Sequence, residues 1–327
     1  MIKISIIIPC LNEDKTIGNV LQAIYLQQYP KEFLEVVLAD GGSIDQTLLK
    51  IEGFKNQHPD LSITLINNPL RHIPAALNRA ISTARGEIII RMDAHSLPRP
   101  DYVQRCAQAL LEGKGENVGG KWEILPGANT WIARGIAIAA SHPLGVGDAR
   151  YRISGQASSV DTVPFGCYYR SLFDRIGFFD ETLLTNEDYE FNTRIRQNNG
   201  TVWFDPEIIC QYFARPTLQE LAIQYWRYGF WKAKMVKRYP TTIKPRQALP
   251  PLFVASLIGL LGLGLFIAPV LSLLLTVFLL YVGIISVASI PAAIKGKDAA
   301  LVVIIPMAIM TMHFTWGTGF LISLAAK

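Results

Sequence analysis

Residues 87–95 read EIIIRMDAH, a short apolar run that ends in a carboxylate and an imidazole. The run over 88–92 has the length of a buried strand, and it follows a helix stop at Ala84-Arg85-Gly86. Asp93 and His95 are therefore expected at the carboxyl end of a strand. Ligands of open α/β sheets bind outside this end, and a carboxylate beside an imidazole can hold a metal ion there.

Strand-like and helix-like segments alternate before this stretch. We expect strands at 4–9, 34–39, 61–66 and 88–92, and helices from Asp14, over 45–54 and over 74–84. Strands separated by helices form parallel βαβ units with right-handed crossovers. The predicted fold is a doubly wound, mostly parallel α/β sheet with flanking helices. After Gly119 the pattern is irregular, with further helices expected over 130–140, 187–198 and 218–236.

The end of the chain differs in composition from the rest. From Ala248 onward the only charged side chains are Lys295, Lys297, Asp298 and Lys327. Since about 20 apolar residues cross a bilayer, we expect three transmembrane helices, at about 250–268, 270–291 and 299–324. A re-entrant or amphipathic element over 250–291 is the alternative, but no polar stripe favours it. The predicted domains are 1–236, a basic juxtamembrane linker at 237–249, and a membrane domain at 250–327.

The basic residues predict the orientation in the membrane. Lysines and arginines crowd residues 232–246, and no Asp or Glu occurs between Glu220 and Asp298. Such a cluster stays in the cytoplasm, and Lys295 and Lys297 fall on the same side after two crossings. The net charge of +5 thus reflects membrane topology and anionic lipid, and no motif indicates nucleic acid.

The first residues lack the pattern of a signal peptide, and the scattered cysteines predict neither a zinc site nor disulfides.

Polar residues follow three of the expected strands. Asn12-Glu13 comes after the first strand, Asp40-Gly41-Gly42-Ser43 after the second, and Asp93-Ala94-His95 after the fourth. Taken singly, the first group could be only a helix cap and the second only a turn. Together on one edge of a parallel sheet they predict a ligand site. No Gly-x-Gly-x-x-Gly follows the first strand and no P-loop is present, which argues against dinucleotide oxidoreductases and P-loop enzymes.

The chain resembles family 2 glycosyltransferases of GT-A fold. Within that family it is similar to the succinoglycan-type glucosyltransferases of bacterial exopolysaccharide assembly. The matching elements are Pro9-x-x-Asn12-Glu13, Asp40-Gly41-Gly42-Ser43-x-Asp45, Ala75-Ala76-Leu77-Asn78, Ala84-Arg85-Gly86-Glu87, Asp93-Ala94-His95, Asn186-Glu187-Asp188 and Gln224-x-x-Arg227-Tyr228. They occur in the order expected for the family over residues 3–236.

The resemblance implies a role for each of these positions. The residues that the resemblance implies for donor binding are Pro9, Asn12, Glu13, Asp40, Gly42, Asn78 and Asp93. A divalent ion, Mg²⁺ or Mn²⁺, is expected on Asp93 and His95 to neutralise the departing nucleoside diphosphate, and imidazole favours Mn²⁺. His95 could instead be only a hydrogen-bond partner.

Asp188 is the expected general base, with Glu187 beside it. An inverting transfer needs a carboxylate that removes the proton of the acceptor hydroxyl during attack on the anomeric carbon. The alternative is that both acids only favour the positive N-terminus of a helix. Gly166 could line the acceptor path or form only a turn.

Four residues on one helical face, Gln224, Arg227, Tyr228 and Trp231, are expected to contact the acceptor or the diphosphate. In the family, Trp usually occupies the position of Tyr228. The sequence therefore does not decide whether the enzyme polymerises processively. An interfacial membrane helix is the alternative for this segment, since aromatic and basic residues alternate there.

The expected activity is inverting transfer of a hexose, with glucose as the expected sugar, from a UDP-sugar to a polyprenyl-diphosphate-linked oligosaccharide. The enzyme is expected at the cytoplasmic face of the inner (plasma) membrane. Membrane lipids are expected partners there, and other exopolysaccharide assembly proteins are candidate partners. A polyprenyl-phosphate sugar synthase is one alternative. A non-catalytic nucleotide-sugar-binding subunit of an export complex is another, although the presence of Asp93 and Asp188 argues against it.

Overall fold

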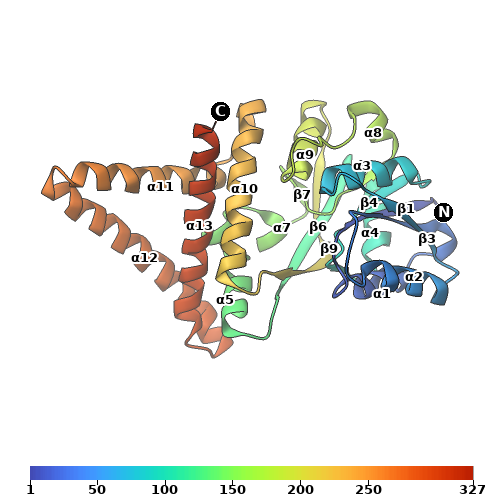
Figure 1. Cartoon of the computed structure of the whole chain (residues 1–327), viewed down its shortest axis with the longest axis horizontal. Helices are drawn as coiled ribbons and strands as arrows, with labels where there is room; N and C mark the ends of the chain where they lie inside the picture. Colours follow the sequence, from blue (N-terminus) through green and yellow to red (C-terminus); the bar gives the residue numbers. More distant parts are fainter. Residues whose placement is uncertain (327) are drawn as a thin grey trace. The chain divides into compact units, whose positions relative to one another are not determined.

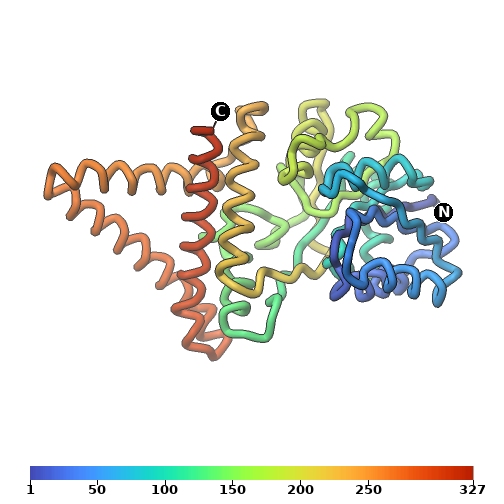
Figure 2. The backbone as a smooth tube through the Cα atoms, viewed as in Figure 1, coloured from blue at the N-terminus to red at the C-terminus, as the bar shows by residue number. Residues whose placement is uncertain are grey.

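A computed structural model describes residues 1–326 and contains two compact units. The first unit comprises Met1–Glu123 and Ser154–Tyr212, and the second comprises Ile124–Ile153 and the chain from Phe213 onward. The backbone therefore leaves the first unit twice, once after Glu123 and once after Tyr212, as the tube in Figure 2 traces.

The sheet of the first unit has the order β3-β2-β1-β4-β8-β6-β9-β5, with β7 beside β9. Strands β1 (Ile4–Cys10), β2 (Leu34–Asp40), β3 (Ser62–Asn67) and β4 (Ile88–Arg91) pair in parallel, which confirms the four expected strands. The remaining strands are β5 (Ser96–Pro98), β6 (Asn117–Pro126), β7 (Ser158–Ser159), β8 (Cys167–Tyr169) and β9 (Val202–Ala214). The pairs β4–β8, β6–β8, β5–β9 and β7–β9 are antiparallel, so the sheet is mixed.

The helices of the first unit bury the apolar faces that the sequence predicts. Helices α1 (Ile17–Tyr25) and α2 (Thr47–Gln57) cover one face of the sheet and α3 (Ile73–Thr83) the other (Figure 1). In α1 the buried side chains are Ile17, Val20, Leu21 and Ile24, which share one helical face. The other helices are α4 (Tyr102–Leu111), α8 (Ser171–Ile176) and α9 (Glu187–Gln197).

Close backbone packing fixes the start of β4. A Cβ atom on Gly86 would lie 2.6 Å from the backbone nitrogen of Ser5, so only glycine fits beside β1 at this point. The three isoleucines and Arg91 that follow are all buried, as expected for a central parallel strand. The polar residues after β4 are thereby carried to the carboxyl edge of the sheet.

The second unit contains the apolar end of the chain. Helices α11 (Pro245–Gly264), α12 (Ala268–Gly296) and α13 (Leu301–Ala325) are each long and apolar enough to cross a membrane. They agree in number with the predicted spans, while α11 begins earlier and α12 is longer at both ends. Shorter helices are α5 (Trp131–Ala139), α6 (Pro143–Val146) and α7 (Arg150–Ile153).

The long helix α10 (Leu218–Arg238) also belongs to the second unit. A Cβ on Gly229 would lie 2.1 Å from the carbonyl oxygen of Trp316, so α10 packs closely on α13. Helix α5 packs on α13 through Gly135 and Ile304 in the same way. The predicted domain limits at 236 and 249 stay a prediction.

Candidate active site

The first two segments at the sheet edge are hydrogen-bonded to each other. The backbone N–H of Asn12 donates to Ser43 Oγ (2.8 Å), and Asn12 Oδ1 accepts from the N–H of Ile44 (2.9 Å). Asn12 has a φ of 56°, a left-handed conformation that asparagine tolerates. The N–H of Glu13 donates to Thr47 Oγ1 (2.7 Å). Pro9, within β1, is half-buried just before this contact.

Asp40 shapes the second segment. Its buried carboxylate accepts from the backbone N–H groups of Gly42 (2.8 Å) and Ser43 (3.0 Å) and from the Ser43 hydroxyl (2.5 Å). Gly42 is exposed and has a φ of 80°, which favours glycine. These contacts match the turn that was the alternative for this motif. Donor binding by Asp40 and Gly42 stays a prediction.

Glu13 joins the first segment to the segment after β4. Its Oε1 lies 3.2 Å from Nδ1 of His95, and its Oε2 accepts from the Thr16 hydroxyl (2.8 Å). Both Glu13 and His95 are partly exposed. A carboxylate that holds one ring nitrogen of a histidine fixes the tautomer and the orientation of the ring.

Arg91 joins the segment after β4 to the start of α9. Its Nη2 lies 2.9 Å from Oε1 of Glu187 and 3.4 Å from Oδ1 of Asp93. Arg91 is 6% exposed and Glu187 5% exposed, so the pair is desolvated. Burial raises the pKa of Glu187 to about 7, an effect that Arg91 opposes and the Asp188 carboxylate increases.

These contacts bring the separate acidic motifs into one continuous site. Asp40 contacts Ser43, Ser43 contacts Asn12, Glu13 contacts His95, and Arg91 contacts both Asp93 and Glu187. The carboxylates of Asp93, Glu187 and Asp188 all act on the single guanidinium of Arg91. Three carboxyl groups therefore share one guanidinium at this edge of the sheet.

A divalent ion fits this donor set. Among residues 1–326, no three His, Cys, Asp or Glu side chains are grouped so that they could hold a metal ion by themselves. Mg²⁺ in nucleotide sites commonly takes only one or two protein carboxylates and completes its shell with substrate phosphates and water. The half-exposed Asp93 and His95 offer that smaller number of ligands.

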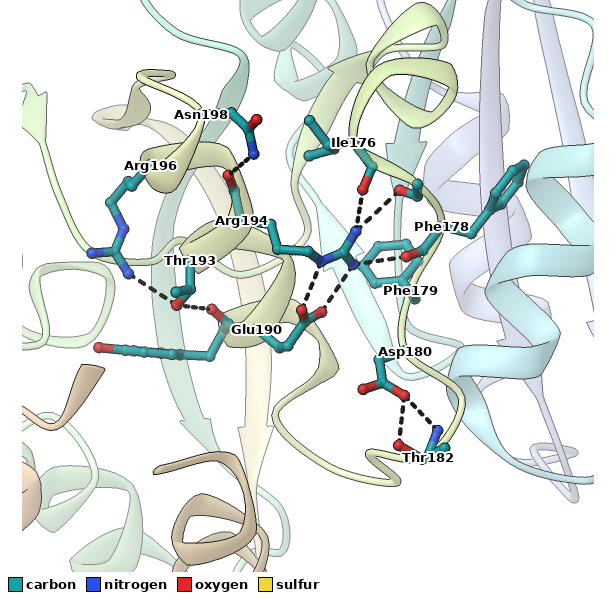
Figure 3. A network of polar contacts seen from close by, with 12 residues as sticks. Ile176, Phe178, Phe179, Asp180, Thr182, Glu190, Thr193, Arg194, Arg196 and Asn198 are labelled. Atoms are coloured by element: carbon teal, nitrogen blue, oxygen red, sulfur yellow. Dashed lines mark hydrogen bonds and ion pairs between the residues drawn. The ribbon is translucent and has the colours of Figure 1, made fainter. Parts of the chain in front are cut away.

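Helix α9 carries the expected base. Asp188 is half-buried in its first turn, and its Oδ1 accepts from the backbone N–H of Tyr189 (2.7 Å). Further along, Arg194 pairs with Glu190 (2.6 Å) and donates to the carbonyl groups of Ile176 (2.6 Å) and Phe178 (2.7 Å), as Figure 3 shows. The second half of α9 is thus fixed to the end of α8 and to the segment after it.

Asn78 and Gly166 have structural contacts. The Asn78 amide donates to Phe179 O (2.9 Å) and Glu181 Oε1 (2.9 Å) and accepts from the N–H of Phe179 (3.0 Å), which ties α3 to that segment. A Cβ on Gly166 would lie 2.1 Å from the Tyr168 hydroxyl oxygen, so this glycine is needed for packing. Donor binding by Asn78 and an acceptor path at Gly166 stay predictions.

The four residues expected to contact the acceptor lie on α10 in the second unit. Arg227 is exposed, whereas Gln224, Tyr228 and Trp231 are half-buried. The ammonium group of Lys234 lies 4.6 Å from the ring centre of Trp231, and Tyr228 packs edge-on against Tyr225. Their contact with acceptor or diphosphate stays a prediction.

Arg91 is the site residue that the sequence argument missed. The signal was present, because a charged residue ends a strand that otherwise reads Ile88-Ile89-Ile90. A charge that is buried in such a strand needs a buried partner of opposite sign.

A comparison with protein families identifies the family of this chain. Residues 5–177 match the family described as Glycosyl transferase family 2, which is just over half of the chain. The chain belongs to glycosyltransferase family 2. This family 2 glycosyltransferase has the α/β fold and the exopolysaccharide-related likeness that its motifs predict.

Two curated relatives match most of this glycosyltransferase. The Succinoglycan biosynthesis protein ExoA of Rhizobium meliloti is 26% identical over 325 residues, which cover 96% of this chain and 93% of ExoA. The Dolichyl N-acetyl-alpha-D-glucosaminyl phosphate 3-beta-D-2,3-diacetamido-2,3-dideoxy-beta-D-glucuronosyltransferase of Methanococcus voltae is 28% identical over 239 residues, 72% of this chain and 74% of the relative.

Solved structures share the GT-A fold. The mannosyltransferase PcManGT from Pyrobaculum calidifontis, in complex with GDP-Man and Mn²⁺, superposes with a TM-score of 0.66 at 20% identity, covering 99% of this chain and 87% of its own. S. aureus TarS 1–349 in complex with UDP gives a TM-score of 0.51 at 17% identity, covering 97% and 90%. At these identities the likeness concerns the fold alone.

Proposed function

We propose that this glycosyltransferase transfers a hexose, with glucose as the expected sugar, from a UDP-sugar to a polyprenyl-diphosphate-linked oligosaccharide, with inversion at the anomeric carbon. The observation that carries the proposal is the continuous set of contacts from Asn12 and Glu13 through His95 and Arg91 to Glu187. These contacts link the residues expected to bind the donor to the helix that carries the expected base.

Each group at the site has a chemical task in this proposal. Asn12, Glu13 and the loop of Asp40 border the nucleoside, and Asp188 takes the proton of the acceptor hydroxyl as its oxygen attacks. Asp93 and His95 hold the divalent ion, Mn²⁺ or Mg²⁺. When bound, the ion neutralises the negative charge that develops on the departing diphosphate.

The membrane unit favours a lipid-linked acceptor. The name of the Methanococcus relative states a dolichyl phosphate-linked sugar, and the three apolar helices would attach the protein to a membrane that contains such a lipid. The basic residues around 232–246 place the catalytic unit on the cytoplasmic side of the inner membrane in this proposal. UDP is preferred to GDP because of the resemblance to the succinoglycan-type enzymes.

A donor screen tests the proposal. Membranes that contain the protein are incubated with radiolabelled nucleotide-sugars in Mg²⁺, Mn²⁺ or EDTA, and label is counted in the lipid fraction. We expect label from UDP-glucose with a divalent ion and none with EDTA. Membranes with the Asp188→Asn variant are the control. Binding of nucleotide-sugars without transfer to any acceptor would overturn the enzymatic proposal and favour a binding subunit.

The acceptor is tested separately. Purified undecaprenyl phosphate and a diphosphate-linked saccharide are offered with the same donor. Transfer only to the saccharide agrees with the proposal, whereas transfer to the bare lipid phosphate identifies a polyprenyl-phosphate sugar synthase. The anomeric configuration of the product, determined by NMR, tests inversion, for which we expect a β-linkage from the α-linked donor.

A further inference from the structure

The contacts of Arg91 differ from those of an ordinary surface ion pair. The residue ends β4, where its backbone N–H donates to the carbonyl of Gly166 (3.0 Å) and the next N–H, of Met92, donates to Ile7 (3.0 Å). The backbone that carries the guanidinium is thus hydrogen-bonded on both sides, to β1 and to the residue before β8. The guanidinium is also buried, and so is its partner Glu187.

The buried guanidinium is poorly satisfied. Its Nη2 makes both ionic contacts, whereas Nε and Nη1 have no hydrogen-bond partner within the described residues. Removing such charges from water costs free energy that a pair with unmet donors recovers only in part. If Arg91 and Glu187 served only the stability of the fold, apolar side chains of similar volume would stabilise it better. This points to a role in the site.

The two partners of Arg91 belong to the two halves of the reaction. Asp93 is one of the two proposed metal ligands, and Glu187 is the first residue of α9, directly before Asp188. The residue before the helix, Asn186, has a φ of 68°, so the chain turns sharply where α9 begins. Two side-chain contacts hold the first turn of α9: the Tyr189 hydroxyl donates to Asp161 Oδ2 (2.8 Å), and Glu187 pairs with Arg91. Of these two, only the Arg91–Glu187 contact joins this turn to the strand that precedes Asp93.

We propose that Arg91 is a positioning residue, which holds Glu187 and Asp93 on one guanidinium and thereby sets the place of the Asp188 carboxylate relative to the metal-bound donor. This inference rests on the proposed function for the role of Asp188. It predicts that the pair is needed for the rate of transfer more than for binding of the nucleotide.

Helix α9 provides a matched control. Glu190 is also buried, also pairs with an arginine at short range, and lies one helical turn after Glu187. Its partner Arg194 donates to the backbone carbonyls of Ile176, Gly177 and Phe178 (Figure 3). Glu187→Gln and Glu190→Gln are therefore the same substitution in the same helix, and only the first changes the proposed positioning contact.

The first test is kinetic. We expect Glu187→Gln and Arg91→Lys to lower kcat by about 10- to 100-fold, with the Kd for UDP in Mn²⁺ changed by less than about threefold, because misplacement of a reacting group mainly affects the rate. Glu190→Gln should keep kcat within about twofold of wild type even if its Tm falls. Equal losses of kcat in the two glutamine variants, or a wild-type kcat in Glu187→Gln, would overturn the proposal.

A second test needs no turnover. Hydrogen exchange of a peptide that covers the first turn of α9 should be faster in Arg91→Lys than in wild type, while exchange in α3 should be unchanged. Unchanged exchange at the first turn would overturn the positioning role even if Arg91→Lys were inactive. Failure of the wild-type enzyme to transfer any sugar would instead contradict the proposed function, so the two failures are distinguishable.

Discussion

The Nδ1 atom of His95 lies 3.2 Å from the Oε1 atom of Glu13, although the two residues follow different strands of the sheet. Histidines that ligate metals commonly give their other ring nitrogen to a carboxylate, which orients the ring and increases its basicity. If His95 ligates the proposed ion, Glu13 orients its ring in addition to the expected contact with the donor.

The Glu13→Gln variant separates these two uses. If Glu13 orients His95, the Mn²⁺-dependent affinity for UDP should fall about 10- to 100-fold, while the affinity in EDTA stays unchanged. Isothermal titration of UDP in Mn²⁺ and in EDTA measures both values. An equal loss under the two conditions would assign Glu13 to the nucleoside instead.

Asp93→Ala should remove the metal dependence of UDP binding altogether. Asp93 is the carboxylate of the expected ligand pair, and His95 alone gives a divalent ion too few protein ligands. Titration of UDP with and without chelator should give one and the same weak affinity. An unaltered difference between the two conditions would remove Asp93 from the metal site.

Asp188→Asn should abolish transfer and leave UDP binding nearly intact. The amide keeps the size of the side chain and can still accept from Tyr189, but it cannot take a proton. Radiolabel transfer and calorimetry on the same preparation measure the two properties. Normal turnover in this variant would exclude Asp188 as the base.

The parallel half of the fold could be predicted because each strand and each helix has its own local signal. The apolar run at 88–92 and the glycine at 86 identify β4 with no knowledge of its neighbours. Strand β8 is only three residues long and pairs antiparallel with β4, a long-range arrangement that no local pattern announces.

The candidate site was predictable to the same extent. Its motifs follow predicted parallel strands, whose carboxyl ends lie at the same edge of the sheet. Asn12-Glu13 and Asp93-Ala94-His95 could therefore be expected at that edge. The contacts between these motifs could not be predicted, because such contacts depend on side-chain geometry. The Arg91–Glu187 pair joins residues 96 positions apart in the sequence, and the use of both Asn78 N–H donors for Phe179 and Glu181 is equally non-local.

Gly166→Ala should destabilise the protein by about 1–3 kcal/mol, because the added Cβ would overlap the buried Tyr168 hydroxyl and Asn117 Oδ1. Gly53→Ala is the matched control. Gly53 is an exposed glycine inside α2 with no atom near its added Cβ, so alanine there should stabilise by about 0.5–1 kcal/mol. Thermal unfolding in detergent measures both. Normal stability with slow transfer in Gly166→Ala would favour the acceptor path.

Membrane orientation can be tested with single added cysteines, since the four native thiols are buried. Burial also raises the pKa of Cys10 to about 12, so its reactive thiolate is scarce at neutral pH. Phe266, between α11 and α12, is 87% exposed, and Lys295, near the end of α12, is also exposed. These positions lie at opposite ends of one predicted span.

If the catalytic unit is cytoplasmic, a membrane-impermeant maleimide should label Phe266→Cys in intact cells and Lys295→Cys only after permeabilisation. The reason is that α12 begins outside and returns to the cytoplasm, where basic residues are retained. The wild-type protein, which should stay unlabelled until it is denatured, gives the background. Labelling of Lys295→Cys but not Phe266→Cys in intact cells would reverse the orientation, and equal labelling would mean that α12 does not cross the bilayer.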